Sequence, residues 1–292
     1  MMVLQDTLPG AAKGEKTRPA VGVVGLGSMG LPIAGHIARA GFNVLAYDLN
    51  HEAVAAAASD GATPCNDLDG LFLDADIVLV LVDTEAAVVD IVEAATRSYA
   101  NQASDNKVVV VGATIRPSVM RELDSKAAAV GFTLLDGPLC KGSIAAEEGT
   151  LLIMAGGDKL AYERCLPVFE CFTSDRYLLG PVGAGQTGKL VNNLILWASV
   201  SITTEGLRLA EALGADPDTL IEALLKSSGR TWALETWTRP RGMTWAEKDM
   251  RMVLEEANDT GLSLPLAGVL HEVVKEVKAR RRESMSSDGG NP

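Results

Sequence analysis

The sequence predicts an α/β fold, a doubly wound parallel sheet, followed by an all-α C-terminal domain that a long helix joins to it. Three observations predict this. Short, almost continuously apolar runs recur through the first half of the chain, which is typical of parallel strands buried on both faces. Segments with helical periodicity separate these runs. After Gly185 the strand-like runs stop, and only helical patterns follow.

The α/β part begins with apolar runs that we expect to be strands, at 20–25, 42–48, 75–83, 107–113 and 132–138. The segments between them repeat apolar residues near a helical period, and the expected helices lie at 31–40, 52–59, 85–98 and 118–130. Further strands near 151–155 and 177–180 flank a helix at 159–169. Because strands alternate with helices, we expect βαβ units that build one sheet covered on both faces.

The second half of the chain is expected to be helical throughout. A long helix is predicted at 186–213, and Gly214 ends it as a C-terminal stop. Further helices are expected at 217–226, 245–261 and 266–282. The ends of the chain show no periodicity. The expected divisions are a flexible tail at 1–18, an α/β domain at 19–181, a helical domain at 182–283 and a flexible tail at 284–292.

Composition argues against several classes of function. The 292 residues carry 26 Lys and Arg against 38 Asp and Glu, a net charge of −12, which disfavours nucleic acid or an anionic membrane as a partner. The 4 cysteines form no CxxC pair, so we expect neither a metal site nor a disulfide framework. No apolar run has the length of a membrane span, and the first residues lack a signal peptide's apolar core. We therefore expect a cytoplasmic protein.

A glycine-rich motif directly follows the first expected strand and opens the first expected helix. The first glycine permits a tight turn, the second leaves room for a pyrophosphate against the backbone, and the third lets helix and strand pack closely. The N–H groups at the start of the helix then face the phosphates. The motif predicts a dinucleotide-binding domain at 19–181, and it consists of Gly25, Leu26, Gly27, Ser28, Met29 and Gly30.

A carboxylate ends the second expected strand. Asp48 is followed by Leu49 and Asn50, and these positions are expected to lie beside the ribose of the dinucleotide. A carboxylate there accepts hydrogen bonds from the ribose hydroxyls and repels a 2′-phosphate. We therefore expect NAD as the cofactor rather than NADP.

Two further motifs combine glycine with polar residues. The first, DGPLCKG, contains Cys140 and Lys141 and ends at Gly142. The second, GAGQTGKLVNN, begins the long helix. Lys189 and Asn193 are four residues apart in this second motif, so they share one face of the helix. A lysine and asparagines in an otherwise apolar helix indicate a polar site on that face.

With these motifs in this order, the chain resembles the β-hydroxyacid dehydrogenases, and it is similar to 3-hydroxyisobutyrate and threonate-type dehydrogenases. The resemblance extends from about Pro19 to Glu276. It implies a Rossmann-like domain, a helical domain for substrate binding and dimerisation, and assembly as a homodimer or homotetramer. It also implies a small-molecule substrate, which we expect to be anionic.

The resemblance also implies roles for individual residues. Lys189 takes the place of the catalytic lysine, and Asn193 that of an asparagine that positions the substrate. A lysine amine accepts the hydroxyl proton during oxidation, and its ammonium returns a proton during reduction. The other implied substrate-binding positions are Cys140, Lys141, Gly142 and Trp232. Beyond the glycine motif and the ribose site, the implied cofactor-binding positions are Val82, Asp83, Thr114 and Lys248, and the threonine that Thr114 matches lies near the nicotinamide in the family.

The substrate loop departs from the family pattern, which reads Ser-Gly-Gly. Cys140 replaces a hydroxyl donor by a weak thiol donor. Lys141 brings a cation to the mouth of the pocket, where it offers an anion contact, partly blocks the pocket or points to solvent. These departures leave a changed substrate as an open alternative.

The leading hypothesis is an NAD-dependent dehydrogenase that acts on a β-hydroxy acid or a related polar alcohol. One alternative is a reductase of an imine or a non-carboxylate carbonyl, but imine-reducing relatives commonly lack the lysine that Lys189 matches. The other alternative is a catalytically inactive dinucleotide-binding interaction module, but such relatives carry a substituted lysine and additional reader domains. Trp197, on the long helix, is expected to lie in the core rather than to contact substrate.

Overall fold

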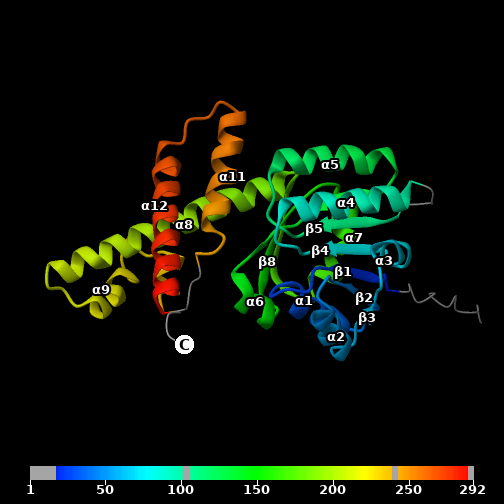
Figure 1. Ribbon diagram of the computed structural model, residues 1–292, viewed down its shortest axis with the longest axis horizontal. Coiled ribbons are helices and arrows are strands. Elements are labelled where there is room, and N and C mark those ends of the chain that lie inside the picture. Colours follow the sequence, from blue (N-terminus) through cyan, green and yellow to red (C-terminus); the bar gives the residue numbers. More distant parts are fainter. Residues whose placement is uncertain (1–17, 101–105, 239–242, 289–292) are drawn as a thin grey trace, which may run out of the picture.

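The computed structural model describes residues 18–100, 106–238 and 243–288, with side chains described as far as 278. An α/β domain lies at the right in Figure 1, and a long helix leads from it into a helical domain at the left. The predicted fold class is thereby confirmed. Of the predicted tail at 1–18, all but Arg18 lies outside the described residues.

One mixed sheet forms the centre of the α/β domain. Its strand order is β3-β2-β1-β4-β5-β6-β8-β7, with β9 paired to β8. The first six strands run parallel, so the carboxyl ends of β1 and β4 meet at one edge, where open α/β sheets bind ligands. The strands are β1 (Val21–Val24), β2 (Val44–Tyr47), β3 (Thr63–Pro64), β4 (Ile77–Val80), β5 (Val108–Val111), β6 (Thr133–Asp136), β7 (Leu139–Cys140), β8 (Leu151–Gly156) and β9 (Thr173–Gly180).

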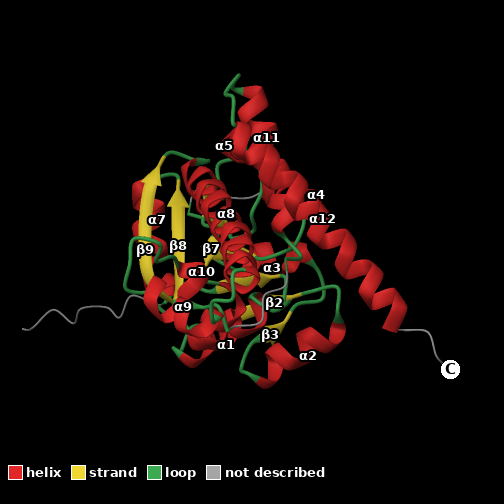
Figure 2. Cartoon of the chain, turned by 90° about the vertical axis from the view of Figure 1, so that its left-hand side faces the viewer, coloured by secondary structure: helices red, strands yellow, loops and turns green. Residues whose placement is uncertain are grey.

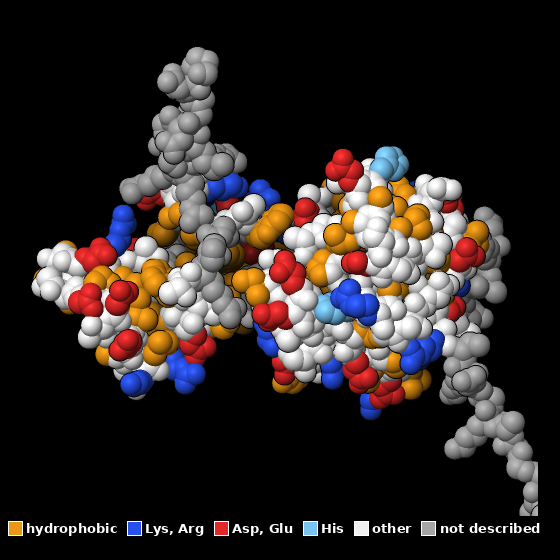
Figure 3. Space-filling view, turned by 90° about the horizontal axis from the view of Figure 1, so that it is seen from below, with side chains coloured by type: hydrophobic (Ala, Val, Ile, Leu, Met, Phe, Trp, Pro, Cys, Tyr) orange, Lys and Arg blue, Asp and Glu red, His pale blue; other side chains and the backbone are white. Residues whose placement is uncertain are grey.

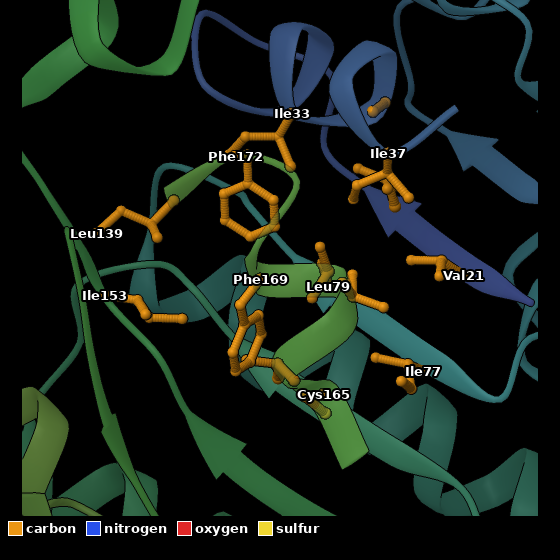
Figure 4. Close-up of a cluster of buried hydrophobic side chains, with 14 of the residues drawn as sticks. Val21, Ile33, Ile37, Ile77, Leu79, Leu139, Ile153, Cys165, Phe169 and Phe172 are labelled. Atoms are coloured by element: carbon orange, nitrogen blue, oxygen red, sulfur yellow. The ribbon is translucent and has the colours of Figure 1, made fainter. Parts of the chain in front are cut away.

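Helices cover both faces of this sheet, and they are α1 (Gly30–Arg39), α2 (His51–Ser59), α3 (Leu68–Asp74), α4 (Glu85–Tyr99), α5 (Pro117–Ala129), α6 (Gly142–Glu148) and α7 (Lys159–Phe169). Side chains alternate between the faces along each strand. Ile77 and Leu79 of β4 join a buried cluster with α1, α2 and α7, part of which Figure 4 shows. Val78 and Val80 join a second cluster with α3, α4 and α5. This division explains why the central strands β1, β4 and β5 are apolar at every position.

The helical domain is built on α8 (Ala184–Ala212), which leaves the sheet directly after β9, together with α9 (Pro217–Leu224), α10 (Trp232–Glu235), α11 (Ala246–Asp259) and α12 (Pro265–Asp288). Figures 1 and 2 show α11 and α12 side by side against α8. Trp197 and Leu190 of α8 pack there with Met250 and Val253 of α11, so Trp197 lies in the core as expected. None of the described helices is long and apolar enough to cross a membrane.

The short elements α3, α6, α10, β3 and β7 were not predicted. Helix α3 is only seven residues long and contains Gly70, so no helical period is established in the sequence. Asp67 begins it by accepting a hydrogen bond from the Gly70 N–H at 2.7 Å. Strand β9 starts at Thr173, ahead of the predicted 177, because the polar residues TSDR do not resemble a strand. Helix α12 continues to Asp288, beyond residue 283, where we expected a tail to begin.

Candidate active site

The glycine motif forms a cradle at the carboxyl end of β1. Gly25 has a positive φ of 94°, and a Cβ on Gly30 would lie 1.8 Å from the Gly25 carbonyl oxygen, so the turn and the close helix contact both require glycine. A Cβ on Gly27 would meet no atom within 4 Å, so this part of the backbone faces open space. Helix α1 begins there without a side-chain cap or an acidic residue in its first turn. The cradle therefore fits a pyrophosphate.

Asp48 lies beside the cradle, directly after β2. Its Oδ2 accepts a hydrogen bond from the Leu26 N–H at 2.6 Å, and its Oδ1 accepts one from the Asn50 N–H at 2.7 Å. The Asn50 side chain begins α2 by accepting from the Glu52 N–H at 3.0 Å, while Leu49 is 85% exposed. The structure thus brings Asp48 to the glycine motif, and the ribose contact expected of it stays a prediction.

The loops after β4 and β5 continue the same edge of the sheet. Val82 lies next to the cradle, because a Cβ on Gly25 would be 3.0 Å from its Cγ1. Lys248 reaches this edge from α11 and donates a hydrogen bond from Nζ to the Thr114 carbonyl oxygen at 3.2 Å. The structure therefore brings Val82 to the cradle and joins Thr114 to Lys248 across the two domains.

Lys248 lies within a group of charged side chains that come from distant parts of the chain. Burial lowers the pKa of Lys248, and the charge of Lys189 adds to this effect, whereas Asp249 and Asp83 oppose it. The Lys248 ammonium also lies 5.8 Å from the centre of the Trp245 ring. The catalytic lysine expected on α8 and the cofactor lysine expected on α11 are therefore close enough to influence each other.

Lys189 lies near the start of α8 and faces the substrate loop. Its Nζ donates a hydrogen bond to the Leu139 carbonyl oxygen at 2.6 Å and lies 3.7 Å from the Cys140 Sγ. Both of those residues belong to β7, and Cys140 is only 6% exposed. The structure thus places the predicted acid/base residue against one of the predicted substrate-binding residues.

Asn193 lies one turn further along α8. Its Nδ2 donates a hydrogen bond to the Asp249 Oδ2 at 2.9 Å, and the Trp197 Nε1 donates to the same oxygen at 3.0 Å. Asn192 donates from its Nδ2 to the Asn193 Oδ1 at 3.0 Å. Asp249 is 3% exposed, and burial raises the pKa of its carboxyl despite these donors and the nearby Lys248. The Asn193 amide is therefore held at both ends.

Two buried polar residues near the site, Asp249 and Gln186, were not predicted as site residues. Gln186 is 0% exposed and bonds to the backbone around Thr114. The helical periodicity of the sequence indicates both residues, because it places each polar side chain on the buried face of its helix. Asp249 falls on the buried face of α11 with Ala246 and Val253, where a carboxylate is rare unless it is paired.

Comparisons with known proteins agree with this arrangement. Residues 20–180 match the NAD binding domain of 6-phosphogluconate dehydrogenase, and residues 183–288 match the NAD-binding family of NADP-dependent 3-hydroxyisobutyrate dehydrogenase. The chain is 30% identical over 279 residues to 2-(hydroxymethyl)glutarate dehydrogenase of Eubacterium barkeri, which covers 91% of this chain and 92% of that relative. It is 31% identical over 263 residues to L-threonate dehydrogenase of Cupriavidus necator, with 87% and 88% covered. This chain belongs to the β-hydroxyacid dehydrogenase family.

A solved structure shares the fold of this dehydrogenase. The 3-hydroxyisobutyrate dehydrogenase of Mycobacterium tuberculosis, solved with L-serine, has a TM-score of 0.82 at 24% identity and covers 89% of this chain and 94% of its own. The family match and the named relatives make the chain an NAD-dependent dehydrogenase that acts on the CH–OH group of a hydroxy acid.

The Lys141 side chain of the dehydrogenase adopts an arrangement that was not among the three expected. Its Nζ donates hydrogen bonds to the Asp175 Oδ2 at 2.8 Å, the Ser174 Oγ at 2.9 Å and the Thr150 carbonyl oxygen at 3.2 Å. The cation therefore ties the substrate loop to β9. Gly142 follows with a positive φ of 79° and begins α6, while Trp232 begins α10 and is 44% exposed. Their contacts with substrate stay predictions.

Lys141 is also the one non-glycine residue of the described part with a positive φ, which is 85°. We expect Lys141→Gly to be more stable than Lys141→Ala by about 1 kcal/mol, because both variants lose the ammonium contacts and only alanine keeps the backbone strain. The larger entropy of an unfolded glycine chain offsets part of this difference. Urea unfolding of the two variants measures it, and an equally stable alanine variant would contradict the left-handed conformation.

The position of Asp48 in the dehydrogenase leads to a prediction on cofactor choice. We expect Asp48→Ser to lower the preference for NAD over NADP by at least about tenfold, because the repulsion of the 2′-phosphate by a carboxylate is removed. The measurement is kcat/KM with each cofactor. Glu52→Gln, on the exposed first turn of α2, is the control for loss of one negative charge nearby. An unchanged ratio in the serine variant would separate Asp48 from cofactor selection.

Proposed function

We propose that this dehydrogenase transfers a hydride between NAD and a small β-hydroxy acid or a related polar alcohol, with Lys189 as the acid/base. The observation that carries this proposal is the placement of the Lys189 ammonium against the substrate loop, 2.6 Å from the Leu139 carbonyl oxygen. Its charge also reaches Lys248, which holds the loop of Thr114. Lys189 thus contacts the expected substrate loop directly, and Lys248 links it to the expected cofactor loop.

Lys189 supplies the proton chemistry of this proposal. NAD, when bound, provides a nicotinamide ring that takes up or returns the hydride. In the direction of oxidation, the neutral amine of Lys189 accepts the proton of the substrate hydroxyl, and in reduction its ammonium donates a proton to the substrate oxygen. The Leu139 carbonyl oxygen and the Cys140 Sγ each accept one N–H of the ammonium, which leaves the third for the substrate.

Asn193 orients the substrate in this proposal. An asparagine amide carries two N–H donors, and Asp249 accepts a hydrogen bond from Nδ2. The remaining N–H is available to a substrate oxygen, and the rotation of the amide is restricted by Asp249 on one side and Asn192 on the other. Since Asn193 lies one turn from Lys189, the two can act on neighbouring atoms of a small molecule.

The charges around the site favour an anionic substrate. Lys189 and Lys248 provide two cations in a chain whose net charge is −12. Cys140 offers only a weak thiol donor beside Lys189, so the substrate carboxylate is held differently from the way a serine would hold it. The placement of Lys189 supports the hydroxy-acid reaction over imine reduction, and the intact lysine and cradle support an active enzyme over an inactive binding module.

A panel of substrates tests this function. We expect at least one β-hydroxy acid, aldonate or polyol to reduce NAD to NADH at alkaline pH. The absorbance of NADH measures this reaction. The same panel is run with NADP, and imines are tested in the reductive direction. Turnover of imines alone, or NADH binding with no turnover of any compound, would reject the proposed reaction and favour the corresponding alternative.

We further propose that the dehydrogenase assembles as a homodimer or homotetramer through its helical domain. Val191, Ile195, Ile202 and Leu209 form an exposed aliphatic stripe along α8, each more than half exposed. Figure 3 shows hydrophobic side chains gathered on this domain, at the left, where a second copy would cover them. Light scattering of the purified protein measures the assembly, and a monomer at micromolar concentration would refute it.

We also propose that the protein resides in the cytoplasm. Its four cysteines, at 65, 140, 165 and 171, all lie in the described part and are free, as they would be in a reducing compartment. Fractionation of the source cells tests this location.

A further inference from the structure

Gln186 is a fully buried amide at the start of α8 whose hydrogen bonds all go to other elements. Its Nε2 donates to the Ala113 carbonyl oxygen at 2.8 Å, and its Oε1 accepts from the Ile115 N–H at 3.1 Å. The side chain therefore bonds to the backbone on both sides of Thr114. A buried amide costs free energy unless it is paired, and this one is paired at both of its ends.

The backbone of Gln186 is anchored as well. Its N–H donates to the Asp136 Oδ2 at 2.7 Å, and the Gly183 N–H donates to the Asp136 Oδ1 at 2.8 Å. Asp136 ends β6 and is 0% exposed. The carboxylate thus fixes the first turn of α8 to the sheet, and Gln186 fixes that turn to the loop that follows β5.

This connection lies between the two halves of the proposed reaction. Thr114 lies between the two residues that Gln186 bonds, is expected next to the nicotinamide, and accepts the hydrogen bond from Lys248 with its carbonyl oxygen. Lys189 lies three residues after Gln186 on the same helix. Because both residues lie within one turn of the continuous helix α8, the Gln186 amide sets the separation between the Thr114 loop and the Lys189 ammonium.

The geometry points to Gln186 as a positioning residue for hydride transfer, one that holds the nicotinamide loop in register with the acid/base lysine. This inference rests on the proposed function of Lys189. Only a side chain with one donor and one acceptor, at the length of glutamine, can make both bonds to the loop. Asparagine is one methylene shorter, leucine has no polar atom, and an ionised glutamate has no proton for the Ala113 oxygen.

Substitution at 186 tests the inference. We expect kcat of Gln186→Leu, expressed per NADH-binding site, to fall about 100-fold, which is the cost of a small misplacement of reacting groups. Thr187→Val is the matched control. Its hydroxyl lies in the same turn and bonds only within the helix, to the Gly183 carbonyl oxygen at 2.9 Å, so its kcat should stay close to that of the unmodified enzyme. Equal rates for the leucine variant and the unmodified enzyme would overturn the inference.

A second variant separates positioning from folding. Gln186→Glu keeps the length of the side chain, and once protonated its carboxyl can donate to the Ala113 oxygen and accept from the Ile115 N–H. The nearby Asp136 carboxylate favours that protonation. We expect the rate of the glutamate variant, relative to the unmodified enzyme, to recover as the pH falls, and that of the leucine variant to show no recovery. A glutamate variant without such recovery would show that the hydrogen bonds to the loop do not control the rate.

Hydrogen exchange provides a readout that does not need turnover. The Ile115 N–H is bonded to Gln186 in the unmodified protein, so the peptide that contains it should exchange slowly and should lose this protection in Gln186→Leu. Unchanged protection in the leucine variant overturns the inference whatever the activity. If the unmodified protein turns over no compound of the panel, the proposed function fails, while the exchange result still decides whether Gln186 holds the loop.

Discussion

The variant Lys189→Met is expected to lose turnover, with a fall in kcat of at least about 1,000-fold, while it binds NADH as the unmodified dehydrogenase does. Methionine fills a similar volume but can neither accept nor donate the substrate proton. The loss should appear in both directions of the reaction, because the same Nζ carries the proton in each. Steady-state rates, together with NADH titration by fluorescence, measure the two expectations separately.

The NADH-binding measurement distinguishes loss of the proton carrier from structural damage to the protein. Lys189 also donates a hydrogen bond to the Leu139 carbonyl oxygen, so its loss could loosen β7 as well as remove the proton carrier. Lys159→Met serves as the control, because that ammonium is 77% exposed on α7. Normal NADH binding without turnover supports the role of Lys189, whereas a methionine variant that retains turnover would refute the mechanism.

The parallel sheet was predictable from the sequence because its determinants are local. The valines of β5 occupy both faces of the sheet in turn, so the run is apolar without interruption and is visible in the sequence. The glycine motif was predictable for the same reason, since the turn, the open backbone and the close helix contact all fall within six neighbouring residues. Short elements such as α3 were not predicted, because tertiary packing stabilises them and their sequences show no clear periodicity.

The candidate site was predictable only in part. The spacing of Lys189 and Asn193 predicts that they share a helix face. The sequence does not predict the hydrogen-bond partners of these two side chains. The bond from Asn193 to Asp249 joins residues 56 positions apart, and it depends on how α8 and α11 pack within the helical domain. The bond from Gln186 to Ala113 joins residues 73 apart, and it depends on how the two domains pack. The rotamer of Lys141 likewise depends on Asp175, which no local pattern connects to the substrate loop.

Asp249→Ala is expected to lower both the free energy of unfolding and kcat. Its Oδ2 accepts hydrogen bonds from the Asn193 Nδ2 and the Trp197 Nε1, and alanine leaves both buried donors without an acceptor. Two unpaired buried donors cost about 3 kcal/mol in total. Without its partner the Asn193 amide can rotate, so substrate orientation is lost in the molecules that stay folded. Urea unfolding and kcat per NADH-binding site measure the two effects.

Asp249→Asn is the matched variant that separates geometry from charge. Both donors bond to the same oxygen of Asp249, and a single amide oxygen has two lone pairs to accept them. We therefore expect the asparagine variant to keep most of the stability and of the orientation of Asn193 that alanine loses. An asparagine variant as unstable as the alanine variant would show that the carboxylate charge, rather than the hydrogen bonds, holds this part of the helical domain together.

The pH dependence of the same pair of proteins tests the state of the buried carboxyl. Burial raises the pKa of Asp249 in the folded protein, so the folded state holds its proton to higher pH than the unfolded chain, whose aspartates titrate at about 3.9. The stability that this group contributes is then fully present below that pH and is lost as the pH rises through the raised value. In the variant Asp249→Asn, the asparagine does not titrate.

The free energy of unfolding of Asp249→Asn should therefore rise relative to that of the unmodified enzyme as the pH increases from 4, and then level off. A difference that is constant with pH, or that changes in the opposite direction, would mean that the bonds from Asn193 and Trp197 and the charge of Lys248 outweigh burial at this site.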